Sequence, residues 1–122
     1  MTLGQAIDRI DSLKHNTFSN AEKVEWLGRL EGTIVQQIIS THEGDGVSFL
    51  GYDEAEDMDT ELIVEAPYDD VYLRWLEMQI DYYNGEIGRY NNSSAMFQAA
   101  YDAYARHYNR NHMPKGNTMK FF

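Results

Sequence analysis

The first apolar pattern in the chain predicts a short amphipathic helix over residues 3–13. Leu3, Ile7 and Ile10 recur there at three- and four-residue spacing, which places them on one helical face, and Leu13 is a candidate fourth member of it. Thr2 immediately precedes this run and can cap its amino end. One face of this helix is therefore expected to pack on a core.

A longer helix is predicted after Ser19, because Ser19 and Glu22 form a capping-box pattern. Gly28 and Gly32 lie inside it, where they either allow the close approach of a neighbouring helix or are simply tolerated at the surface. Its expected buried face consists of Val24, Leu27, Leu30, Ile34 and Ile38.

Residues 41–66 interrupt the helical period and are called the arm from here on. Two short apolar pieces within it, residues 47–50 and 62–64, are each compatible with a brief strand. A connection of this length is unusual in a compact domain and is often functional or disordered. The two apolar pieces favour a docked loop or a short β-hairpin over plain disorder.

The carboxyl-terminal half predicts two further helices. Pro67 suits a first helical position, and the apolar period then continues over residues 68–90. Gly85 or Gly88 can bend or end this helix, and residues 91–93 are expected to form the turn before the last one. The expected core comprises Trp26, Leu27, Ile34, Trp75, Leu76, Ile80, Phe97, Tyr101 and Tyr104.

These patterns predict one all-α domain, residues 1–122, with about four helices, the arm at 41–66 and a tail at 113–122. The chain has no cysteine, which excludes disulfide and thiolate chemistry. Its amino end lacks the layout of a signal peptide, and no apolar run approaches the roughly 20 residues of a membrane span. We therefore expect a protein without membrane partners.

Charge divides the chain into an acidic middle and a basic end. Residues 51–70, the acidic block, contain nine carboxylates and no Lys or Arg, whereas the whole chain has a net charge of −10. No acidic residue follows Asp102, and four basic residues do. The overall charge argues against sequence-specific nucleic-acid binding, which depends on Lys and Arg at phosphates.

The acidic block does not fit a calcium loop. If Asp57 were the first ligand of an EF-hand, Leu62 would replace the required Gly and Tyr68 the final Glu. Loose Ca²⁺ or Mg²⁺ binding stays an open alternative to a solvated acidic loop that a basic partner neutralises.

Signs of catalysis are weak elsewhere. His107 and His112 are five residues apart and would not share a helical face, and residues 85–89 lack the Lys and Ser/Thr of a phosphate loop. With no Cys and no nucleophile motif, we expect a non-enzymatic protein without a cofactor, and we predict no catalytic, cofactor or metal residues.

The charge pattern favours contacts between copies of the chain. An acidic surface on one copy can meet a basic surface on the next, while like surfaces repel, and such head-to-tail contacts close into rings when the rotation allows. The expected interface residues are Asp53, Glu54, Glu56, Asp57, Asp59, Glu61, Arg106, Arg110, Lys115 and Lys120.

Residues 66–116, APYDDVYLRWLEMQIDYYNGEIGRYNNSSAMFQAAYDAYARHYNRNHMPKG, resemble small structural proteins of tailed phages and prophages of Gram-positive bacteria. The YNN sequence, the tyrosine-rich last helix and the HMPKG ending are similar to the head–tail connector, or head-completion, class. The resemblance implies a mostly helical virion assembly protein whose long loop reaches a neighbouring subunit in an oligomeric ring beneath the portal. Its partners would be itself and the portal or a neighbouring neck protein.

The resemblance implies a place in the bacterial host cytoplasm during assembly and later in the virion neck. A tail-assembly or other neck protein would have nearly the same composition. Two alternatives from other classes are a carboxylate-rich metal-dependent hydrolase and an acidic adaptor that binds a basic host protein. A Mg²⁺-dependent thermal shift would favour the hydrolase, and a salt-sensitive monomeric complex would favour the adaptor.

Overall fold

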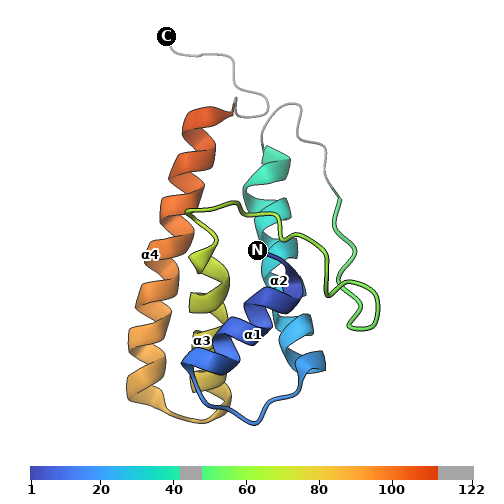
Figure 1. The fold of residues 1–122 in the computed structure, drawn as a ribbon. Coiled ribbons are helices and arrows are strands. Elements are labelled where there is room, and N and C mark those ends of the chain that lie inside the picture. The colour runs from blue at the N-terminus through green and yellow to red at the C-terminus, as the bar shows by residue number, and fades with distance from the viewer. Residues whose placement is uncertain (42–47, 113–122) are drawn as a thin grey trace.

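The structure, a computed structural model, describes residues 1–41 and 48–112. This part of the chain is all-α, as predicted, with helices α1 (Leu3–Leu13), α2 (Asn20–Gln37), α3 (Asp70–Tyr83) and α4 (Ile87–Asn111). A short 3₁₀ helix, η1 (Ile39–Thr41), follows α2. Figure 1 shows α3 and α4 packed along their lengths, with α1 crossing in front and α2 on the far side of α3 from α4. None of these helices is long and apolar enough to cross a membrane.

Both predicted amino-terminal caps are present. Thr2 accepts a hydrogen bond from the Gln5 amide, and the Gln5 side chain accepts one from the Thr2 amide in return. Ser19 and Glu22 make the same reciprocal pair at α2. Each box satisfies amides that have no partner inside the helix.

The core confirms most of the predicted apolar faces. All five apolar residues expected on one face of α2 are buried, as are Leu76 and Ile80 of α3 and Tyr104 of α4. Trp75, Phe97 and Tyr101 are only half-buried. The Trp75 indole links α3 to α2, because its Nε1–H donates a hydrogen bond to the Trp26 carbonyl over 2.7 Å.

The boundary between the last two helices differs from the prediction. The helix expected over residues 68–90 ends at Tyr83, because Gly85 adopts a φ of +72°. The Gly85 amide then donates to the Tyr82 carbonyl over 3.1 Å and the Glu86 amide to the Asp81 carbonyl over 3.1 Å. These two bonds form a Schellman cap, for which glycine in the left-handed region is the favoured residue.

The expected turn at residues 91–93 is therefore wrong, since these residues lie inside α4. Ser93 is buried and donates to Asp81 Oδ2 over 2.9 Å, which ties α4 to α3. Pro67 also lies three residues before α3 and not at its first position.

The arm forms a docked loop, and its described residues, 48–66, contain no strand. One isolated bridge joins Glu61 to Thr2. Residue 47, the first of the predicted strand 47–50, lies outside the described residues, while Leu62 and Val64 of the second piece are buried in the core. Burial of these two side chains holds the loop on the helices without a hairpin.

Candidate functional site

The arm caps the amino end of α1 through its backbone. The Thr60 carbonyl accepts from the Leu3 amide over 2.9 Å, and the Met58 carbonyl accepts from the Gly4 amide over 2.8 Å. Both amides belong to the first turn, where a helix supplies no acceptor of its own. The arm is thus part of the folded body at this point.

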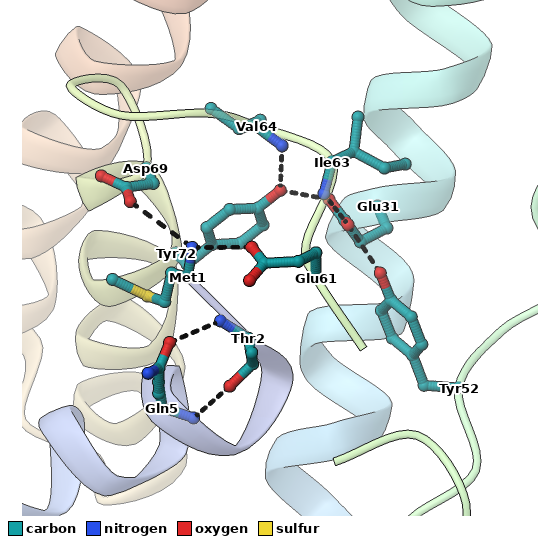
Figure 2. Close-up of polar contacts among 10 residues, drawn as sticks. All are labelled: Met1, Thr2, Gln5, Glu31, Tyr52, Glu61, Ile63, Val64, Asp69 and Tyr72. Atoms are coloured by element: carbon teal, nitrogen blue, oxygen red, sulfur yellow. Dashed lines mark hydrogen bonds and ion pairs between the residues drawn. The ribbon is translucent and has the colours of Figure 1, made fainter. Parts of the chain in front are cut away.

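A buried carboxylate fixes the arm at a second point. Glu31 of α2 is 0% exposed and accepts hydrogen bonds from Tyr72 Oη over 2.6 Å, Tyr52 Oη over 2.7 Å and the Ile63 amide over 2.9 Å. Tyr72 Oη in turn accepts from the Val64 amide over 2.8 Å. Figure 2 shows these groups converging from α2, α3 and two parts of the arm. One side chain therefore joins two helices to the acidic segment.

Burial dominates the electrostatics of this cluster. It raises the pKa of Glu31, while the three hydrogen bonds to its carboxylate act in the opposite direction. Burial, together with the neighbouring Glu31, also raises the pKa of Tyr72 and Tyr52 well above that of an ordinary tyrosine. Both phenols therefore stay protonated and act as hydrogen-bond donors.

Two predicted interface residues, Asp53 and Asp57, shape the arm locally. Asp53 Oδ1 accepts from the Ala55 amide over 2.8 Å, and Asp57 Oδ2 accepts from the Asp53 amide over 2.7 Å. The first bond is that of an Asx turn, and in the second the Asp57 side chain reaches back four residues along the same loop. These two carboxylates fold the tip of the arm and are less available to a partner.

The remaining predicted acidic residues, Glu54, Glu56, Asp59 and Glu61, are exposed. Glu61 lies 3.1 Å from the Met1 amino group, and its side chain is still 73% exposed. Within residues 1–41 and 48–112, no three His, Asp or Glu side chains gather as a metal site would require. The carboxylates of the arm instead cover an outer surface.

The two described basic residues of the predicted set lie on another side of the molecule from the tip of the arm. Arg106 and Arg110 are exposed on the carboxyl-terminal half of α4, and Lys115 and Lys120 lie outside the described residues. In Figure 1 the first described part of the arm runs along the side of α2 away from α3, its last residues cross back in front of the helices to α3, and α4 forms the opposite side. Within the described residues, Arg106 and Arg110 are therefore not brought together with the carboxylates at the tip of the arm.

The two histidines near the end of α4 stack on aromatic rings. His107 lies on Tyr68 with ring centroids 4.5 Å apart, and His112 lies on Tyr108 at 3.7 Å. They line a hollow of about 210 Å³ with Tyr104. This aromatic cluster closes the end of the bundle that lies beside η1.

Sequence patterns missed three buried charged residues. Glu31 is one, and the others are Lys23, which lies 2.6 Å from Asp11, and Asp81, whose Oδ1 lies 2.8 Å from Lys14 Nζ. A signal existed for Glu31, because apolar Leu27 and Val35 precede and follow it by four residues and so place it on the buried face.

Comparison of the chain with protein-family models, with curated proteins and with solved structures gives no match.

Proposed function

We propose that the protein is a non-enzymatic assembly subunit whose copies join head to tail. The observation that carries this proposal is the position of the arm's tip, which places the exposed Glu54 and Glu56 beyond α2, while Arg106 and Arg110 are exposed on α4. Unlike charges on opposite sides attract successive copies in one orientation and disfavour contacts between like surfaces.

The docking of the arm supports this role energetically. A partner that binds a loose loop must order it, at a cost to affinity, whereas a surface that is already ordered avoids this cost. Glu31 and its three donors anchor the arm in the single chain. The carboxylates of Glu54, Glu56 and Asp59 are thereby presented on a preformed surface.

The resemblance to phage structural proteins gives the proposal its biological setting. In that setting the subunit is of the head–tail connector type, assembles in the host cytoplasm and forms a ring beneath the portal in the virion neck. The portal or a neighbouring neck protein is its other partner. An all-α body with a long acidic loop suits this role.

Native mass spectrometry across a protein concentration series tests the proposal. We expect closed multimers at low salt that dissociate as salt rises, because screening weakens contacts between exposed charges. A parallel series with Mg²⁺ should leave the mass unchanged. A monomer at every concentration, or one stoichiometrically bound Mg²⁺ per chain, would contradict the proposal and favour the adaptor or the hydrolase, respectively.

A further inference from the structure

A surface groove separates α2 from the tip of the arm. It has a volume of about 780 Å³ and is open along one side. Gly28 and Gly32 of α2 lie on its floor, and a Cβ at these positions would be 3.7 Å from the Tyr52 amide nitrogen and 3.8 Å from Phe49 Cδ2. The two glycines therefore lie next to the arm, and no side chain of theirs fills the groove.

The groove combines apolar walls with negative charge. The Phe49 and Tyr52 rings pack edge to face with centroids 4.8 Å apart, and both rings are half-buried. Its charged lining consists of Glu25, Arg29, Asp53 and Glu54. Arg29 lies 3.6 Å from Glu25, so the lining has a net charge of −2.

An exposed apolar residue adjoins this groove. Leu50 follows Phe49 and precedes Gly51, which both line the groove, and Leu50 is 99% exposed. Leu50 thus extends the apolar surface that the Phe49 and Tyr52 rings form in the groove. The groove therefore suits a partner segment that carries both positive charge and apolar side chains.

Residues 113–122 of the same sequence have this chemistry. The segment MPKGNTMKFF contains two lysines, two methionines and two phenylalanines, and no Asp or Glu. Its side-chain charge of +2 is opposite in sign to the −2 of the groove lining, and its apolar residues match the walls. We infer that this groove receives residues 113–122 of a second copy, an inference that rests on the proposed head-to-tail assembly.

The arrangement of the helices favours a second copy over the same chain. Residues 113–122 follow α4, whereas the groove lies between α2 and residues 49–55 of the arm. Figure 1 shows this part of the arm on the side of α2 away from α3 and α4. Ten residues span at most about 36 Å when fully extended. A segment that reached the groove of its own chain would have to pass around α3 and α2, whereas the segment of a neighbouring copy has no such path to cover.

Charge exchange in the full chain tests the inference, with association measured by sedimentation velocity. Glu54→Lys and Lys120→Glu should each weaken association at least about tenfold, and the two together should restore it to within about threefold. Glu56→Lys, on the same arm but outside the groove, should weaken association by a smaller factor than Glu54→Lys, and Lys120→Glu should not restore it. Unchanged melting temperatures would verify that all variants are folded.

Two outcomes separate the groove from the proposed function. Equal losses with Glu54→Lys and Glu56→Lys, together with no effect of Lys120→Glu, would overturn the groove inference and leave assembly through the acidic surface intact. An unmodified chain that stays monomeric at low salt would overturn both.

Disulfide trapping distinguishes the source of the segment, because the natural chain has no cysteine. An oxidised mixture of Ala55→Cys and Asn117→Cys proteins should give the mixed disulfide in at least about tenfold higher yield than Gly88→Cys with Asn117→Cys. Gly88 is an exposed control on α4 with open space around it. A double variant, Ala55→Cys/Asn117→Cys, that closes only an intramolecular bond would overturn docking of a second copy.

Discussion

The Glu31 carboxylate accepts a 2.6 Å hydrogen bond from Tyr72 Oη, and both side chains are fully buried between α2, α3 and the arm. Two further donors, Tyr52 Oη and the Ile63 amide, reach the same carboxylate from the arm. This relationship fixes the acidic segment to the helical body.

Replacement of the central carboxylate should loosen the arm. Glu31→Gln puts an amide group where a hydrogen-bond acceptor is needed, so at least one buried donor loses its partner, and we expect a loss of about 1 to 3 kcal/mol in unfolding free energy. Urea unfolding measures this loss in unfolding free energy. The control Glu25→Gln, on the exposed face of α2, should change stability by less than about 0.5 kcal/mol. Equal effects of the two substitutions would contradict the anchoring role.

Glu31 should also make stability depend on pH. Because burial raises its pKa above 4.5, the folded chain keeps a proton on Glu31 where the unfolded chain has lost it. This stabilising contribution is complete below pH 4.5 and is lost as the pH rises through the raised pKa. The stability difference between the unmodified protein and Glu31→Gln should fall by up to about 1.4 kcal/mol per pH unit in that window. Denaturant unfolding over a pH series measures this stability difference. A difference that grows with pH would show that the hydrogen bonds lower the pKa of Glu31 by more than burial raises it.

Because α1 contacts the arm at Gly4, replacing this helical glycine with alanine should lower the stability of the protein. An alanine usually stabilises a helix by up to about 1 kcal/mol relative to glycine, but a Cβ at Gly4 would lie 3.0 Å from the Met58 carbonyl oxygen. We expect Gly4→Ala to destabilise the protein by about 1 kcal/mol or more, as the arm is displaced. Gly88→Ala, with nothing within 4 Å, should be neutral or stabilising. Thermal unfolding compares the two, and stabilisation by both would refute close docking of Met58.

The pair Ser93 and Asp81 tests the revised helix boundary. Ser93→Ala should cost about 1 to 2 kcal/mol, because Asp81 Oδ2 loses a buried donor. The neighbouring Ser94, half-buried, provides the control, and Ser94→Ala should have less than half that effect. In a double-mutant cycle with Asp81→Asn, purely additive losses would exclude the contact between α3 and α4 at this position.

Local sequence signals predicted most of the fold. Thr2, Ser19 and the apolar face of α2 act within one or two turns, so spacing alone identifies them. The α3–α4 boundary was misplaced because Gly85 and Gly88 offered two possible ends, and only the backbone at Gly85 has a positive φ. The contacts of Glu31 lie 21 to 41 residues away in sequence, so helical spacing could reveal its burial but not its partners.

The candidate site was predicted in part. The acidic and basic sets are visible in sequence because charge is a property of composition. Composition could not show that Asp53 and Asp57 bond to nearby amides while Glu54 and Glu56 remain exposed. The groove was also beyond prediction, since it depends on how Phe49 and Tyr52 approach α2.

Sedimentation velocity of a charge-reversed arm tests the central claim most directly. Glu54→Lys/Asp59→Lys reverses two exposed carboxylates of the arm, and Asp8→Lys/Glu77→Lys reverses two carboxylates on α1 and α3. Each double change reduces the net negative charge equally, so general repulsion falls by the same amount in both. We predict that the arm variant remains monomeric under conditions where the unmodified chain and the control assemble. Assembly of the arm variant at the same concentration and salt would contradict the proposal that the acidic arm joins successive copies.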